Sequence, residues 1–287
     1  MTWFTLSLMS VFALAAAELT QQHLLNAKNA FNARASAVFT FLFQSLLTLP
    51  IIFLFSLQGE LLDIFHRDTI FKLFAVSAVG SVAMVLYLKS FKVKNISIST
   101  IFVSGSTIVS TTLGIIFLNE GAYLSKFAGI SLILSAIIIL NIRNASLEKN
   151  HYFGLLAGAL FGIAYTLDKS ILLKINPLVY IFWAFFLVAL FGFILNPKSV
   201  IDSAREKSAR DYKPIIFSGF GYFLYNFFTF SAYRLGGEVG KIDAINNTQV
   251  FIIIFFEFFI LKYTQSLALK LATALIAAIG IFMLRIE

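Results

Sequence analysis

The chain contains no cysteine, and charged residues make up only 13% of its 287 residues. The lack of cysteine excludes disulfides, thiol catalysis and thiolate metal sites. A soluble protein carries roughly 25% charged residues, and half of that fraction leaves too few polar groups to cover a globule. The sequence therefore indicates a protein whose solvent is largely lipid.

Motifs for catalysis and for metal binding are also missing. The three histidines, His23, His66 and His151, stand at the ends of apolar segments or in expected loops, without the spacing of a metal site. The sequence has no nucleotide-binding lysine loop, no nucleophile elbow and no paired acidic loop of a metal-dependent transferase. We therefore expect no enzyme activity, no cofactor and no metal site.

Basic residues outnumber acidic ones by 22 to 14, which gives a net charge of +8. They stand mostly singly at the ends of apolar segments, where Lys and Arg contact anionic headgroups. The chain has no basic run of the kind that binds nucleic acid. The charge therefore predicts a lipid bilayer, and not nucleic acid, as a partner.

What the chain has in abundance is long apolar runs, since 59% of its residues are hydrophobic and 34 are Phe. An apolar helix of about 20 residues crosses the hydrocarbon core of a bilayer. None of the runs alternates with period two, which excludes a transmembrane barrel. We predict an all-α membrane protein with ten transmembrane helices, over residues 3–22, 35–57, 70–90, 96–118, 124–141, 152–174, 177–195, 213–233, 241–261 and 265–285.

The two halves of the chain resemble each other. Shifted by 141 residues, "FKLFAVSAVGSVAMVLYLKS" falls on "YKPIIFSGFGYFLYNFFTFS", and at a shift of 142 "SGST" (104–107) falls on "NNTQ" (246–249). The spans then group as five plus five, in repeats 1–145 and 150–287. Because each repeat has an odd number of spans, the second is inverted relative to the first. Inverted repeats are typical of alternating-access transporters, whose substrate site lies near the membrane midplane between the halves.

Two segments of the first repeat resemble a known family. In "FLNEGAYLSKFAGISLILSAIIIL" a short apolar span ends at Glu120 and Gly129 opens the next helix, as at the end of an EamA domain. "LYLKSFKVKNISIST" resembles the turn between the third and fourth helices of that domain. Two such domains in tandem resemble the drug/metabolite transporter superfamily, which implies ten helices and secondary transport. The second repeat departs from the pattern, with Lys262 and Leu271 in place of the Glu and the Gly.

The ninth span is the richest in polar residues. "KIDAINNTQVFIIIFFEFF", read as one continuous helix, places Asp243, Asn247 and Glu257 on one face, with Asn246 and Gln249 beside it. Exposure of these polar groups to lipid would be costly, so this face of the helix is expected to point toward the interior of the helix bundle. We predict that Asp243, Asn246, Asn247 and Gln249 line a substrate site. A polar network that holds helices together is the open alternative.

The fourth span carries a stripe of hydroxyls, Thr100, Ser104, Thr107 and Thr111, which faces either the cavity or a neighbouring helix. We include Thr100, Ser104 and Thr107 among the substrate-binding candidates. The neighbouring row of Ser106, Ser110 and Gly114 is typical of close helix packing.

Carboxylates near the ends of the spans have two readings each. Glu18, close to Gln21 and Gln22, is either a proton or cation site or a residue at the headgroup level, and we include it among the substrate-binding candidates. Asp168 is followed at once by Lys169, which suggests the interface. Glu120 is expected in a turn.

Aromatic residues of the second half complete the candidate site. Tyr225 and Asn226 lie together in the middle of the eighth span, and Tyr165 belongs to the sixth. Aromatic rings in a cavity can hold an amphipathic molecule or a cation. With 16% aromatic residues in the chain, however, ordinary packing explains some of them.

These patterns predict a secondary transporter, an exporter or exchanger, of small polar metabolites such as amino acids. Its solute cavity is expected between the halves, lined by the first, third, fourth, sixth, eighth and ninth spans, in the inner membrane of a bacterium. A lipid-linked sugar flippase with an apolar groove between spans is one alternative, and a membrane accessory protein without transport is another. The oligomeric state is left open.

Overall fold

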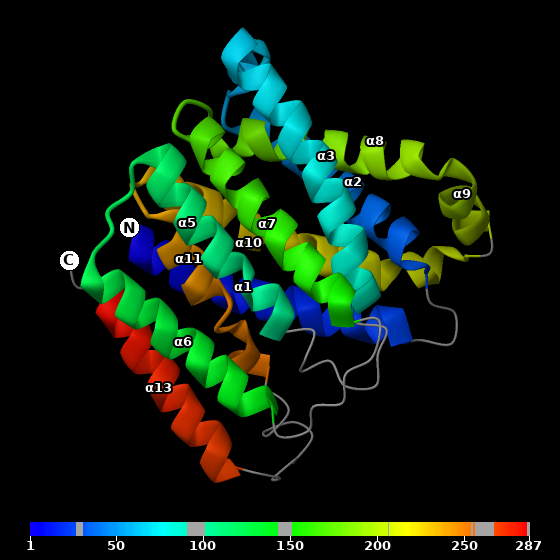
Figure 1. Ribbon diagram of the computed structural model, residues 1–287. Helices are drawn as coiled ribbons and strands as arrows, with labels where there is room; N and C mark the ends of the chain where they lie inside the picture. The colour runs from blue at the N-terminus through cyan, green and yellow to red at the C-terminus, as the bar shows by residue number, and fades with distance from the viewer. Residues whose placement is uncertain are drawn as a thin grey trace.

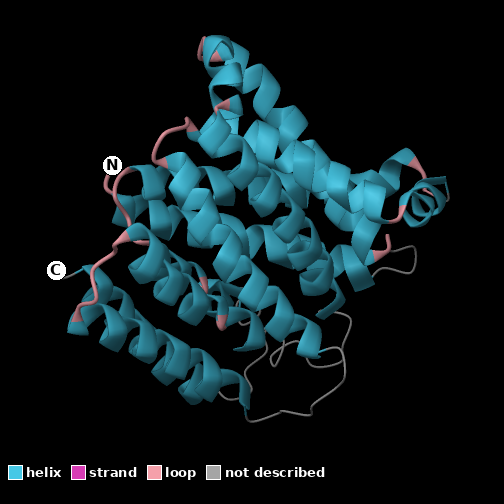
Figure 2. Ribbon diagram, turned by 45° about the horizontal axis from the view of Figure 1, so that its top comes forward, coloured by secondary structure: helices cyan, strands magenta, loops and turns pink. Residues whose placement is uncertain are grey.

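The computed structural model describes residues 1–26, 31–90, 101–142, 151–205, 207–253, 255 and 267–285. Within these ranges the chain is helical, without any strand (Figures 1 and 2). The helices are α1 (Trp3–Asn26), α2 (Ala33–Leu54), η1 (Gln58–Phe65), α3 (Arg67–Ser90), α5 (Ser106–Leu118), α6 (Leu124–Ile142), α7 (His151–Leu172), α8 (Pro177–Leu195), α9 (Pro197–Arg205), η2 (Ala209–Tyr212), α10 (Lys213–Arg234), α11 (Val239–Asn246) and α13 (Leu267–Arg285).

Eight segments within the described ranges are long and apolar enough to cross a membrane, and the helix over Leu124–Leu140 is a shorter apolar one. Together they account for every predicted span except 241–261. Many large apolar side chains on their outer faces are exposed, among them Phe12, Phe71, Phe217 and Phe282. Exposed Phe on this scale fits a surface covered by lipid, in which apolar side chains lie at no cost.

Several helix ends follow from local sequence. The side chain of Asn32 accepts a hydrogen bond from the backbone N–H of Ala35, 2.8 Å away, and so caps α2. Asn176 caps α8 in the same way, and Pro177 follows at the first helical position, where the missing N–H costs nothing. Asn119 ends α5 in the left-handed conformation, with φ at 53°.

The helices pack in pairs that join distant parts of the chain. α1 packs against α10, α3 against α7, α2 against α8, and α6 against α13. Figure 1 shows α6 and α13 side by side at one edge, next to the group that holds α5 and α11. The largest apolar core gathers around α8, where Val179, Tyr180 and Ile181 are fully buried.

The predicted continuous helix over 241–261 is wrong. α11 ends at Asn246, residues 247 and 248 form a turn, and helix resumes at 249. The N–H of Thr248 bonds to the Ile245 carbonyl over 3.0 Å, a three-residue step that tightens the turn. The Thr248 hydroxyl donates to the same Ile245 carbonyl over 2.6 Å, so a side chain competes with the helical backbone for hydrogen bonds at the break.

The fourth predicted span has a similar interruption. Residues 101–104 are helical, Gly105 forms a turn, and α5 starts at Ser106. The N–H of Gly105 bonds to the Phe102 carbonyl over 3.2 Å. Glycine weakens a helix at such a point because it lacks a side chain to restrict the backbone.

Candidate solute site

A cavity of about 110 Å³ lies among the helices. A single water needs roughly 10–15 Å³ by this kind of measure, so the cavity has room for several waters or a small solute. Side chains from α1, α2, α3, α5, α7, α8, α10 and α11, from Val103, and from Asn247 and Gln249 beyond α11 line it. The predicted set of lining spans therefore lacked two contributors, α2 with Phe41 and α8 with residues such as Tyr180 and Phe185.

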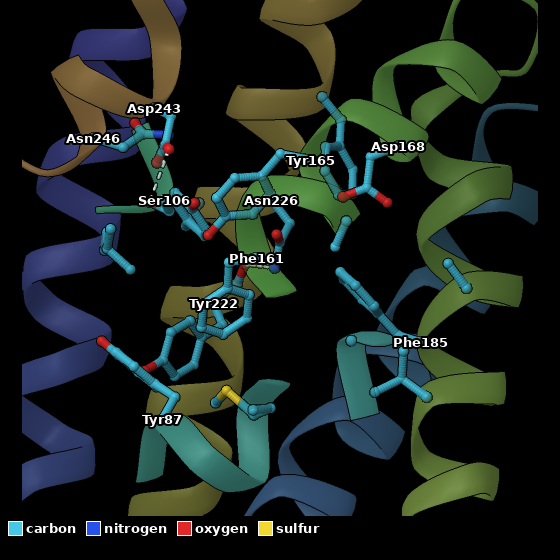
Figure 3. A pocket seen from close by; sticks show the side chains of 18 of the residues that line it. Tyr87, Ser106, Phe161, Tyr165, Asp168, Phe185, Tyr222, Asn226, Asp243 and Asn246 are labelled. Carbon is cyan, nitrogen blue, oxygen red and sulfur yellow. Dashed lines mark hydrogen bonds between the residues drawn. The ribbon is translucent and has the colours of Figure 1, made fainter. Parts of the chain in front are cut away.

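Asp243 on α11 lies at one side of the cavity (Figure 3). Its carboxylate accepts hydrogen bonds from the hydroxyls of Ser106, at 2.8 Å, and Ser110, at 3.1 Å, both on α5. The Asn247 amide donates to it more weakly, over 3.4 Å. The small-residue row on α5 thus brings two hydroxyl donors to a buried carboxylate, besides letting the helices pack closely.

The two asparagines at the helix break connect α11 to its neighbours. The Asn246 amide donates to the Thr229 hydroxyl over 3.2 Å, and its oxygen accepts from Ser10 on α1. The Asn247 amide donates to the Thr107 hydroxyl on α5 over 2.9 Å. Both asparagines also line the cavity. They therefore serve packing and lining at once.

Glu18 lies on the cavity wall contributed by α1. The hydroxyl of Tyr87 on α3 donates to its carboxyl group. With its nitrogen toward Glu18, the Gln249 amide lies 3.3 Å from each carboxyl oxygen. Turned over, the same amide donates to the Asn247 carbonyl and presents its oxygen to Glu18. The Gln249 amide therefore contacts Glu18 in either orientation, and in the second it also bonds to the backbone at the helix break.

Asp168 on α7 also lines the cavity, although its sequence suggested the interface. The hydroxyl of Tyr180 on α8 donates to it. Its neighbour Lys169 is 2.8 Å from the Glu120 carboxylate instead, since consecutive helical residues point about 100° apart. In the sequence, a shift of 150 residues places Glu18 on Asp168, each near the end of the first span of its half, and this correspondence is a signal for the position.

The charges of the cavity lining have one sign. Among the described residues, the lining contains three carboxyl groups, of Glu18, Asp168 and Asp243, and no Lys, Arg or His. In addition, the buried hydroxyl of Tyr222 makes no hydrogen bond of normal geometry to the part of the chain that the structure describes, and Figure 3 shows this side chain beside Tyr87. No group of three or more possible metal ligands gathers among the described residues.

The structure brings most of the predicted site residues together. Ser104 is not part of the lining, and its hydroxyl bonds to the Ile101 carbonyl of its own helix over 2.8 Å. Thr107 lies behind the lining, where it contacts Asn247. Thr100 lies outside the described residues. Of the residues predicted to bind substrate, those that line the cavity are Glu18, Tyr165, Tyr225, Asn226, Asp243, Asn246, Asn247 and Gln249.

A second group of charges, the lysine cluster, consists of Glu120, Lys126, Lys169, Glu238 and Lys241. Glu120 lies between α5 and α6, in a turn as expected, but its side chain is only 3% exposed. It accepts from Lys169 at 2.8 Å, from Lys126 at 3.2 Å and from the N–H of Val239, the first residue of α11, at 2.7 Å.

Glu238 completes the lysine cluster. It lies 2.5 Å from Lys126 and 3.6 Å from Lys241, whose ammonium group also sits over the ring of Trp3 at 5.8 Å. The cluster thereby joins the α5–α6 connection, the end of α7 and the start of α11 through buried ion pairs.

Comparison with known proteins agrees with this architecture. Residues 149–286 match the model of the EamA-like transporter family. This segment, just under half of the chain, is similar to an EamA-like transporter domain. The predicted resemblance is confirmed for this half, and the apolar helices indicate an integral membrane protein.

The fold of the chain is shared with a known structure over almost its whole length. A crystal structure described only as "Crystal structure of protein" superposes with a TM-score of 0.75 and 10% sequence identity. The alignment covers 99% of this chain and 97% of the other. At this identity the likeness concerns the fold alone. No curated protein matches the sequence at a significant level.

Proposed function

We propose that the protein is a secondary transporter, an exporter or exchanger, of small polar metabolites such as amino acids. The two halves alternately open the cavity to one side of the bacterial inner membrane and then to the other. The observation that carries this proposal is the interruption of the helix at residues 247–248, which sets Asp243, Asn246, Asn247 and Gln249 on the cavity wall. Interrupted helices at membrane depth are tolerated where they line a cavity, and they are typical of solute sites.

The packing of the helices supports inverted repeats. In this arrangement each helix of the first half has a counterpart in the second, in the order α1, α2, α3, α5, α6 and α7, α8, α10, α11, α13. If every helix is replaced by its counterpart, the contact between α1 and α10 becomes a contact between α7 and α3. Both contacts are present in the structure. The α2–α8, α5–α11 and α6–α13 pairs map onto themselves, and all three exist. Exchange of the halves therefore preserves the main helix contacts.

The two interruptions support the same correspondence. The shift of 142 residues that aligns "SGST" with "NNTQ" places Gly105 on Asn247, and the structure has a turn at both positions. Corresponding interrupted spans in the two halves of a membrane protein point to its binding site. The repeats 1–145 and 150–287 are thus proposed on sequence and on packing.

Accessibility of single cysteines tests alternating access, since the chain has no cysteine of its own. Asn226→Cys faces the cavity on α10, and Phe220→Cys, on the same helix, replaces an exposed outer side chain. In oriented membranes, an impermeant thiol reagent should label Asn226→Cys from either side and leave Phe220→Cys unlabelled. An Asn226→Cys protein that inserts normally yet reacts from neither side would contradict the proposal.

Replacement of an amide tests the substrate class. Asn247→Leu removes a polar group from the lining while keeping a similar volume. In proteoliposomes loaded with a panel of radiolabelled amino acids, we expect this variant to lose most of the exchange seen with the unaltered protein. Unchanged exchange in a protein that inserts at the normal level would refute the role of the amide.

The flippase alternative has one observation in its favour. An apolar groove of about 440 Å³ lies between α2, α8 and α9, lined by residues such as Phe39, Phe193 and Ile201. Such a groove fits an acyl chain. None of its described lining residues lines the central cavity, however, and the groove lining has no carboxyl or amide side chain.

A further inference from the structure

We propose that the transported solute is an organic cation, an amine with an apolar or aromatic body, and that Asp168 is the carboxylate that binds its ammonium group. This inference rests on the proposed function, because it names the solute class of the same cavity. It differs from that proposal in excluding solutes whose charge is negative.

The charge of the lining is the first argument. Three carboxyl groups reach the cavity, and no basic side chain of the described lining balances them. An unpaired charge in an apolar surrounding is costly, so the lining favours a positively charged guest over a neutral one. A negatively charged guest would add repulsion to this cost.

The hydrogen bonds distinguish the three carboxyl groups. Asp243 accepts from Ser106, Ser110 and Asn247, and Glu18 accepts from Tyr87 and faces the Gln249 amide. An ionised carboxylate can accept about four hydrogen bonds. The side chain of Asp168 accepts one, from Tyr180, within the described part of the chain. It therefore has the most free capacity for the N–H groups of a guest.

The surroundings of Asp168 suit an apolar body. Tyr165, one turn before it on α7, stacks on Phe161 with the ring centres 5.8 Å apart. On the other side Tyr180 meets Phe230 edge to face at 5.3 Å, and Phe230 lies 6.1 Å from Phe185. All of these rings line the cavity (Figure 3). Aromatic faces attract a cation and also cover an apolar body.

Tyr222 supplies an observation independent of the carboxyl groups. Its side chain lines the cavity and is 6% exposed, and its hydroxyl, which lies beside that of Tyr87, makes no hydrogen bond of normal geometry to the described residues. Buried hydroxyls without a partner are rare, and each calls for an explanation such as a missing ligand or water. A guest with a polar substituent, beyond its ammonium group, would satisfy this hydroxyl.

A matched series of ligands tests the proposal. Phenethylamine, phenylalanine, 2-phenylethanol and 3-phenylpropionate share a phenyl body and differ in charge. Binding to the purified full-length protein in detergent is measured by calorimetry. We expect phenethylamine to bind at least tenfold more tightly than phenylethanol, and phenylpropionate to bind weakest.

Variants assign the effect to Asp168. Asp168→Asn should lower the affinity for phenethylamine at least tenfold and leave phenylethanol unaffected, whereas Asp168→Glu should keep the preference for the amine. Asp202→Asn on α9 removes an exposed carboxylate outside the cavity and should change nothing. The glutamate variant also guards against a fold defect in the asparagine variant.

Three results overturn the inference: equal or tighter binding of phenylethanol or phenylpropionate, an unchanged amine affinity in Asp168→Asn, or no binding of the amine at millimolar concentration. Cysteine labelling separates this failure from that of the proposed function. If Asn226→Cys reacts from both sides while the amine is not preferred, transport stands and the solute class is wrong. If the amine binds through Asp168 and labelling occurs from neither side, the binding site stands without transport.

Discussion

Asp168 and Lys169 are neighbours in the chain, yet they belong to two regions that differ in whether their charged groups have partners of opposite charge. Asp168 faces the cavity, where carboxyl groups have hydroxyl and amide partners and no basic residue is among the described lining. Lys169 enters the lysine cluster, where it pairs with Glu120. The cluster pairs three lysines with two glutamates inside the protein, while the carboxyl groups of the cavity have no basic partner among the described lining residues. This contrast predicts that charge removal in the cluster harms stability and charge removal in the cavity harms binding.

Glu120→Gln should have the largest effect on stability. It leaves Lys169 buried beside a neutral amide and takes from Lys126 one of its two carboxylate partners, the other being Glu238. Removal of one partner of a buried ion pair costs about 3–5 kcal/mol. We expect a clear fall in the thermal unfolding temperature of the detergent-purified protein. Asp63→Asn, at an exposed carboxylate of η1, is the control and should shift stability by less than about 0.5 kcal/mol. Equal shifts in both variants would show that the cluster is not structural.

Gly114→Ala should come next. A Cβ at this position would lie 2.6 Å from a carboxylate oxygen of Glu120, so it displaces that side chain from its lysines. Overpacking of this kind typically costs about 1–3 kcal/mol. Gly80→Ala is the matched change at the cavity, where the new Cβ meets Val188 at an ordinary 3.5 Å. Gly80→Ala should leave the unfolding temperature nearly unchanged. If the unfolding temperature fell further in Gly80→Ala than in Gly114→Ala, packing at the cavity would matter more for stability than packing at the cluster.

Tyr87→Phe should have a smaller effect. It removes the hydroxyl that donates to Glu18, and one intramolecular hydrogen bond contributes about 1 kcal/mol net, more where the partner is charged. The unfolding temperature should fall slightly. Tyr123→Phe, on a Tyr outside the cavity that is exposed, serves as the control. A loss as large as that of Glu120→Gln would mean that the cavity, too, is held together by its charges.

Asp168→Asn should have the smallest effect on stability, and the unfolding temperature should stay the same or rise slightly. It neutralises a buried carboxyl group that has no basic partner in the described lining and keeps an oxygen for the Tyr180 hydroxyl. Groups that bind a guest often reduce the stability of the empty protein. The measurement is the unfolding temperature without ligand, set beside Glu120→Gln. A loss of several kcal/mol would show that Asp168 has a structural role, because that is the cost of breaking a buried pair.

The sequence predicted the membrane class and most of the spans because these depend on local composition. A run of about 20 apolar residues has few alternatives to a membrane helix, whatever surrounds it. The polar character of the ninth span was equally plain, and Asp243, Asn246, Asn247 and Gln249 all line the cavity. The alignment of 104–107 with 246–249 also pointed to the two positions where the helices are interrupted.

Other features of the site were not predictable from the same patterns. The break at residues 247–248 depends on competition between side-chain and backbone hydrogen bonds, which a helical face pattern ignores. Asp168 was placed at the interface because Lys169 stands beside it. Tyr87 and Tyr180 were not recognised as partners of Glu18 and Asp168, since each pair joins two different helices.

The sequence alone determined that the chain is a helical membrane protein, where most of its apolar helices lie, and that one span carries groups too polar for lipid. These properties follow from composition and from the transfer of side chains between water and hydrocarbon. Only the tertiary structure decided which charges meet. Glu120 joined three positions far apart in the chain, and Asp168 and Lys169 turned to different neighbours. The physical reason is that a buried charge is stabilised by whatever packs around it, and that partner is set by helix packing and not by proximity in the sequence.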